Sequence, residues 1–211
     1  MTTKLGVYNK ALGNIGQRKL ASISENVEAR RALDDWWDLD AFLEGGIWRF
    51  ARRTAQLIYT PSIEPSFGYR RAFEHPSDFI RTAEMASDEY FTQPLRAYSS
   101  EAGFFFSDID VLYIKYVSND AQYGGDFALW TPAFENWVSW YLASKVCLRL
   151  NGDEKKSMMA IKMEDRMLKV ARSRDSMEDP STKPPHGTWA RARSGRSGHR
   201  WSRGDQDSIT G

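Results

Sequence analysis

The chain has 211 residues, of which 41% are hydrophobic, a mean hydropathy of −0.57 and a formal net charge of +1. It is long enough to bury a substantial core, and no apolar run reaches the roughly 18 residues that a membrane span needs. We therefore expect a soluble protein, and the first residues lack the continuous apolar stretch of a secretion signal. The only cysteine, Cys147, excludes an internal disulfide, and its apolar surroundings predict a core residue.

In chain order, the first two predicted elements are helices. Leu5, Tyr8 and Leu12 fall on one face of a helix that glycines end near residue 16. A second helix is predicted over about 25–43, with capping-box spacing at its start and two glycines at its end. One face of this helix is acidic and is expected to meet water or an open channel. The channel-facing candidates are Asp34, Asp35 and Asp38.

The middle of the chain, residues 54–127, reads as a β-rich insertion. Prolines and glycines between residues 61 and 76 exclude a long helix there. Short runs of β-branched and aromatic residues then predict strands that form one small antiparallel sheet. The predicted strands are 67–73, 79–85, 95–99, 103–106 and 111–117, after an extended segment at 57–59.

The segment from Thr131 to Leu150 is predicted to be the central helix of the fold. Thr131 can cap its start, Pro132 suits the first helical position, and Gly152 can end it. Only a narrow stripe, with Glu135, Lys145, Arg149 and Ser139, is polar, so the rest of its surface must be covered by the same chain or by a second copy. The candidates for subunit contacts are Trp137, Trp140 and Tyr141.

A last helix is predicted over about 154–177, packed on one side and exposed on the other. The expected fold class is therefore α+β, mainly α, with a four-helix core, a small inserted antiparallel sheet and an extended C-terminal arm. The predicted regions are a helical core over 1–53 and 128–179, the insertion over 54–127, and the arm over 180–211.

The arm differs from the rest of the chain in charge and composition. From residue 180 onward, six basic and two acidic side chains give +4, which leaves −3 for residues 1–179. Such a Pro, Gly, Ser and Arg-rich segment cannot order itself alone, but two tryptophans among the arginines suit insertion into a groove of a partner. The residues predicted to make this contact are Lys183, Trp189, Arg191, Arg193, Arg196, Arg200, Trp201 and Arg203.

Catalytic and metal-binding motifs are sparse in the sequence. The three histidines, His75, His186 and His199, lie far apart, so we expect no metal site, and nothing points to a cofactor. No phosphate-binding loop or nucleophile motif is present. The acidic cluster at residues 34–38 could supply an acid and a base to a peptidoglycan-cleaving glycosidase, and the basic arm could grip DNA phosphates. A glycosidase and a DNA-binding module therefore stay open as alternative functions.

Several strings, in a fixed order, resemble one family of bacteriophage proteins. They are ALGNIGQRKLASISEN, IWRFARRTAQL, FGYRRAFEHPSDFIR, VLYIKYV and FENWVSWYLASKVCLRLNGD, and together they span roughly residues 5–175. The family is that of the head-to-tail connector or adaptor proteins, which includes the tail tubular protein A group. The chain departs from the family pattern at His75, where an apolar residue is usual, and in its long arm of arginines and tryptophans.

The resemblance implies a structural virion protein with no catalytic activity. It implies a homo-oligomeric ring, typically a dodecamer, that docks under the capsid portal in the neck of the virion after synthesis in the host cytoplasm. Its partners would be further copies of itself, the portal protein, a tail nozzle or tail tube protein, and double-stranded DNA that passes without sequence-specific contact during genome ejection. No membrane is involved. An acidic channel lining would let DNA slide, because phosphate contacts supply most nonspecific DNA affinity.

Overall fold

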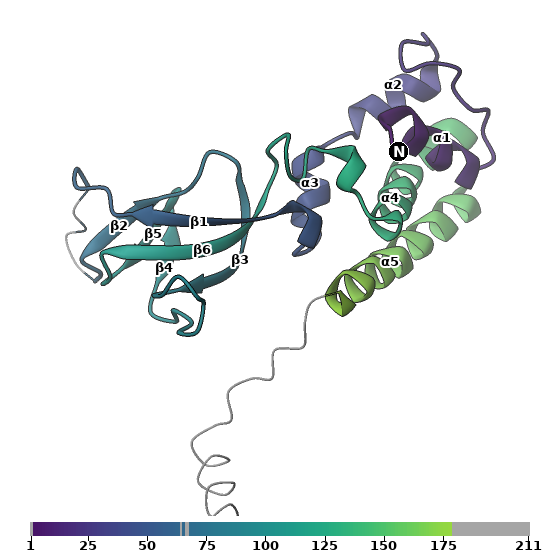
Figure 1. Cartoon of the computed structure of the whole chain (residues 1–211). Coiled ribbons are helices and arrows are strands. Elements are labelled where there is room, and N and C mark those ends of the chain that lie inside the picture. Colours follow the sequence, from purple (N-terminus) through teal and green to yellow (C-terminus); the bar gives the residue numbers. More distant parts are fainter. Residues whose placement is uncertain (1, 64, 66–67, 179–211) are drawn as a thin grey trace, which may run out of the picture. The chain divides into compact units, whose positions relative to one another are not determined.

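The computed structural model describes residues 2–63, 65 and 68–178 (Figure 1). These residues form five α-helices and two three-stranded antiparallel sheets, and the predicted class, α+β and mainly α, is confirmed. Residues 1–178 make one compact unit. The predicted arm, residues 180–211, lies outside the described residues. The helices are α1 (Lys4–Asn14), α2 (Glu28–Asp35), α3 (Leu39–Glu44), α4 (Pro132–Asn151) and α5 (Glu154–Met177).

The central helix α4 begins and ends as its sequence predicts. The Thr131 hydroxyl accepts a hydrogen bond from the Phe134 N–H, and Pro132 occupies the first turn. Gly152 adopts a left-handed φ of 61°, and its N–H donates to the Leu148 carbonyl. The next helix, α5, follows after Asp153, whose carboxylate caps it. Because the connection is so short, α4 and α5 form a helical hairpin.

The second predicted helix is two helices, and the prediction of one continuous helix over 25–43 is wrong. Asp38 adopts an extended backbone, and its carboxylate accepts hydrogen bonds from the N–H groups of Asp40 and Ala41. An aspartate that caps a new helix competes with continuation of the old one. The start of the first of these helices also differs from the prediction. Glu25 was expected in a capping box at the helix start, but its carboxylate accepts a hydrogen bond from the Ala21 N–H, and α2 begins only at Glu28. The helical core therefore has five α-helices, not four.

The inserted region contains two sheets, so the prediction of a single sheet is also wrong. In the first, β6 pairs with β1 on one side and with β3 on the other; in the second, β5 lies between β2 and β4. A central strand such as β6 can pair on both edges, and hydrophobic alternation alone does not show which strands become its partners. The strands are β1 (Arg52–Ile58), β2 (Arg71–Glu74), β3 (Phe79–Ala86), β4 (Ser99–Glu101), β5 (Phe104–Ser107) and β6 (Val111–Ser118).

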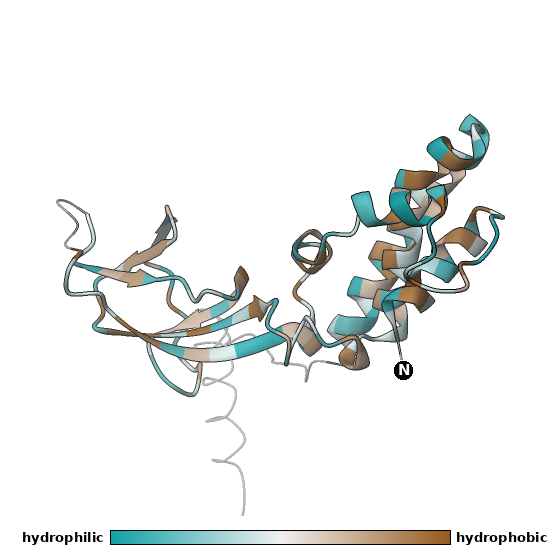
Figure 2. Ribbon diagram, turned by 90° about the horizontal axis from the view of Figure 1, so that it is seen from above, coloured by the Kyte–Doolittle hydropathy of each residue, from teal (hydrophilic) through white to brown (hydrophobic). Residues whose placement is uncertain are grey.

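The core has two clusters, one among the helices and one among the strands. Figure 2 shows hydrophobic and hydrophilic residues interspersed along helices and strands, as expected of elements that bury one side. In the helical cluster, the Trp48 ring lies 4.8 Å from Phe134 and 5.5 Å from Trp137, centroid to centroid. In the strand cluster, Phe73, Phe105 and Leu112 are fully buried. Aromatic packing therefore accounts for many of the tryptophans.

Candidate assembly surfaces

Two of the three predicted channel-facing acids have basic partners within the chain. Asp34 accepts a hydrogen bond of 2.7 Å from the Tyr8 hydroxyl and forms ion pairs with Lys4 and Arg30. Burial raises the pKa of the Asp34 carboxyl, but the hydrogen bond from Tyr8 and the charges of Lys4 and Arg30 outweigh this and hold its pKa below the ordinary value. A general acid needs a raised pKa, so Asp34 does not favour the glycosidase reading.

Asp35 and Asp38 differ in their surroundings. Asp35 and Glu28 both bind the guanidinium of Arg149 on α4, with a distance of 2.7 Å from Arg149 Nη1 to Asp35 Oδ2. Asp38 is exposed and, among the described residues, forms no ion pair beyond its role in capping α3. The charges of Asp34 and Asp35 are therefore largely compensated within the chain, which speaks against a strongly negative channel lining at these two residues, whereas the charge of Asp38 is not compensated by an ion pair among the described residues.

The predicted subunit contact at Trp137 is corrected by the structure. Its side chain is only 3% exposed, because Trp48, Phe134 and Tyr141 surround it and Gly45 packs against the ring edge. A Cβ at Gly45 would lie 2.5 Å from the Trp137 ring. Almost no ring surface remains for a neighbouring subunit. The indole instead ties α4 to the turn that follows α3.

Part of the surface of Trp140 and of Tyr141 stays exposed, and so does part of Trp36, which was not among the predicted contact residues. Trp140 and Tyr141 are half-buried, while Trp36 is 45% exposed. The Lys145 ammonium lies 5.0 Å from the centre of the Tyr141 ring and 5.7 Å from that of Trp36. Only packing distinguishes Trp36 from Trp37, which packs against Tyr8 and Phe42. No local signal could have identified the exposed member of the pair.

The polar stripe predicted on α4 is covered over part of its length. Glu135 is 9% exposed and binds Lys10 of α1 at 2.7 Å, and Ser139 is fully buried. Asn14 of α1 donates to the Ser139 hydroxyl. Because α1 supplies these polar partners, it covers the stripe that was expected to face water. Toward the end of α4, Lys145, Leu148 and Arg149 are exposed.

In the β-rich region, Asp78 gathers the most polar contacts. Its carboxylate accepts hydrogen bonds from the Tyr116 hydroxyl at 3.0 Å, from Arg53 at 2.9 Å, and from the Ser118 hydroxyl. Burial raises the pKa of the Asp78 carboxyl, but the bonds from Ser118, Arg53 and Tyr116 outweigh it and lower the pKa, while burial and Asp78 raise the pKa of Tyr116 to about 12. These bonds anchor the loop before β3 to β1 and β6.

An open hollow of about 530 Å³ lies beside Asp78. His75 lines it and packs on two aromatic rings, with its centroid 4.0 Å from Phe105 and 4.5 Å from Phe79. Desolvation lowers the pKa of His75, which favours the neutral ring at neutral pH. His75 therefore packs here as a largely apolar side chain, and its Nε2 atom lies 3.4 Å from the hydroxyl oxygen of the exposed Ser100.

Cys147 is fully buried on α4, as expected of a core residue. Within the described part of the chain, no cluster of acidic, cysteine or histidine side chains is arranged to hold a metal ion, and no helix is long and apolar enough to cross a membrane. The eight predicted contact residues of the arm, Lys183 to Arg203, all lie outside the described residues.

No family model matches the chain, and no curated protein is significantly similar to it.

Proposed function

We propose that this chain is a head-to-tail adaptor of a bacteriophage, a non-catalytic virion protein whose copies form a ring, twelve in number if it follows the family, between the capsid portal and the tail. In this role the ring sits in the neck of the virion, binds the portal on one side and a tail nozzle or tail tube protein on the other, and lets double-stranded DNA pass without sequence-specific contact.

The observation that carries the proposal is the ordered set of family-like strings and the elements on which they fall. Within residues 1–178, the strings lie at the end of α1 and in the connection after it, on β1 and the turn before it, on β2 and the start of β3, on β6, and on α4. They thus fall on both the helical core and the sheets of one compact unit, in the order that the resemblance requires, although none falls on α2, α3, β4, β5 or α5. A chance likeness of a single motif would not recur in this order along the chain.

A second observation supports an assembly role. Exposed tryptophan, isoleucine and methionine side chains remain on the helices and in the turns beside them, including Trp36, Ile47, Met158, Met159 and Ile161, each 40–62% exposed. Exposed apolar side chains that gather in one region mark surfaces for other proteins. The described residues therefore carry surface that suits association.

Deleting residues 180–211 is expected to abolish portal docking and to leave the body folded. The compact unit ends at residue 178, so the deletion removes no contact within it. The truncated and full-length proteins should show the same thermal unfolding midpoint, while only the full-length protein should cosediment with tailless capsids that contain portal. Replacing Trp189 and Trp201 by alanine should weaken docking in the same direction, because large aromatic anchors dominate such contacts. Unchanged cosedimentation of the truncated protein would show that docking uses another surface.

A further inference from the structure

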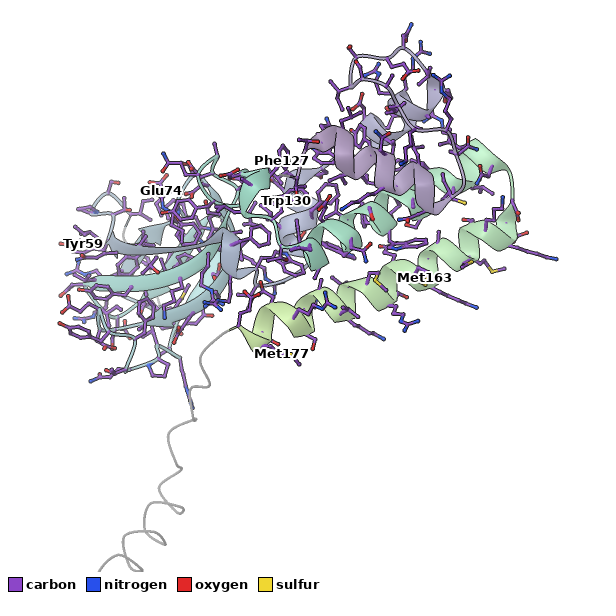
Figure 3. All side chains as sticks on the ribbon, turned by 45° about the vertical axis from the view of Figure 1, so that its right-hand side comes forward. Tyr59, Glu74, Phe127, Trp130, Met163 and Met177 are labelled. Atoms are coloured by element: carbon purple, nitrogen blue, oxygen red, sulfur yellow. The ribbon has the colours of Figure 1, made fainter. Side chains whose placement is uncertain are left out.

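The outward side of α5 carries four basic side chains in one row. Lys155, Lys162, Arg166 and Lys169, here named the basic stripe, follow one another at intervals of seven, four and three residues, which places them on one face of a helix. The row extends about 21 Å at 1.5 Å per residue. Figure 3 shows α5, with Met163 and Met177 labelled, lying along α4 on one side and open on the other. All four side chains are exposed.

No described residue neutralises the basic stripe. None of its four side chains forms an ion pair with any described residue, although Glu154 and Asp165 lie close to it on the same helix. The helix carries seven basic and four acidic residues, whereas residues 1–153 carry 16 basic and 20 acidic residues. A net charge of +3 therefore stands on one helix of a body that is otherwise acidic.

Apolar side chains beside the stripe favour a protein over DNA as its occupant. Met158, Met159 and Ile161 are 52%, 62% and 48% exposed. A phosphate backbone would contact the cations but would leave these side chains in water, whereas protein interfaces are enriched in methionine. The occupant should thus carry both acidic and apolar groups.

Such a surface exists on the same chain, around α3. Asp38, Asp40 and Glu44, here named the acidic surface, are exposed and form no ion pair among the described residues. Asp40 and Glu44 lie four residues apart, on one side of α3. The exposed apolar side chains of Trp36 and Ile47 flank this surface. It therefore complements α5 in both charge and apolar character.

The acidic surface and α5 of the same subunit approach each other near the C-terminal end of α5, where Arg172 donates hydrogen bonds to the Gly45 carbonyl. The basic stripe lies earlier on α5, over residues 155–169, and its side chains stay exposed. Both surfaces are therefore open to a second copy. If the basic stripes of two copies faced each other, like charges would lie together, so a contact through the stripe must join it to a different surface of the second copy. Contacts of this head-to-tail kind build rings when the rotation between copies closes.

We propose that the basic stripe of α5 binds the acidic surface of a second copy of this chain and that this is the lateral contact of the ring. The inference rests on the proposed function, which it deepens by naming the surfaces. The contact consists of ion pairs between the Lys and Arg heads of one copy and the carboxylates of the next, with Met158, Met159 and Ile161 against Trp36 and Ile47.

A charge swap in the full-length protein tests the contact. One variant carries Lys162→Glu and Arg166→Glu, the other carries Asp40→Lys and Glu44→Lys, and sedimentation velocity at low salt reports assembly. Each variant alone should need about 100-fold more protein to assemble than the wild type, because like charges then face each other. An equimolar mixture should assemble again, since each copy then meets an opposite charge on both sides. A matched control, Lys19→Glu with Arg96→Glu, changes two exposed cations elsewhere and should assemble as the wild type does.

The outcomes separate this inference from the proposed function. If either variant alone forms the wild-type assembly, or if the mixture fails to assemble while the wild type succeeds, the lateral contact lies elsewhere and the ring stands. If the stripe variant assembles normally but loses binding to a duplex DNA fragment, the stripe is a DNA surface and the inference is overturned. A wild-type protein that stays monomeric at every soluble concentration contradicts the ring itself.

Discussion

Replacing Asp78 by alanine is expected to lower the free energy of unfolding by about 3 kcal/mol at neutral pH, as breaking a partly buried ion pair does. The carboxylate is the common acceptor for Arg53, Tyr116 and Ser118, and its side chain is only 13% exposed. Its loss leaves buried hydroxyl groups and a guanidinium without their acceptor. We place the value at the lower end of the range because the Arg53 side chain is 39% exposed and partly solvated. Urea unfolding followed by tryptophan fluorescence measures the change.

The same carboxylate makes part of the stability depend on pH. The pKa of Asp78 is lower in the folded protein than in the unfolded chain, where it is about 3.9. Its contribution is therefore complete above that value and is lost as the pH falls through the lower, folded pKa. The difference in unfolding free energy between the wild type and Asp78→Asn should shrink below about pH 4. A difference that stays constant down to pH 2 would show that the Asp78 charge does not contribute.

Introducing a methyl group at Gly124 is expected to destabilise the protein by about 3 kcal/mol, at the upper end of the usual cost of overpacking. A Cβ there would lie 2.4 Å from the Ser118 carbonyl oxygen and 2.6 Å from a Leu43 methyl carbon. The Gly124 carbonyl also accepts a hydrogen bond from the Trp130 indole. Because the nearest atom belongs to the backbone of β6, it cannot move aside without disturbing the sheet.

Gly13→Ala serves as the control for Gly124→Ala. Gly13 lies in the last turn of α1, and a Cβ there would meet nothing within 4 Å. Alanine in a helix is favoured over glycine by roughly 0.5–1 kcal/mol, so this variant should be slightly more stable than the wild type. Thermal unfolding of the two variants should shift in opposite directions. Equal and small shifts in both would mean that the loop at Gly124 rearranges at little cost.

The elements that could be predicted from sequence are those with strong local signals. Thr131, Pro132 and Gly152 mark the ends of α4, and α5 occupies the predicted range. The break between α2 and α3 was not predicted, because Asp38 was assigned to the acidic face of one long helix, whereas it caps the start of α3. Whether five strands form one sheet or two depends on pairing between distant segments, which local patterns do not encode.

The candidate site was harder to predict, because its surfaces depend on which residues the fold covers. Glu135 was placed on the polar stripe of the central helix, yet it is buried, and Lys10 of α1 binds it. Trp137 was expected to contact a neighbouring subunit, yet Trp48 and Phe134 bury it within its own subunit. The α5 stripe could be found from spacing, but only the absence of ion pairs to it among the described residues distinguishes it from an ordinary solvated face.

The measurement that tests the central claim most directly is the mass of the assembly on portal-containing capsids. Tailless capsids incubated with the full-length protein, then washed and imaged by electron cryomicroscopy, should show a closed ring of this protein at the portal vertex and nowhere else. Native mass spectrometry of the released ring should give a multiple of the 24.2 kDa subunit, twelve if the family number holds. Binding of monomers only, or no density at the portal, would contradict the adaptor role.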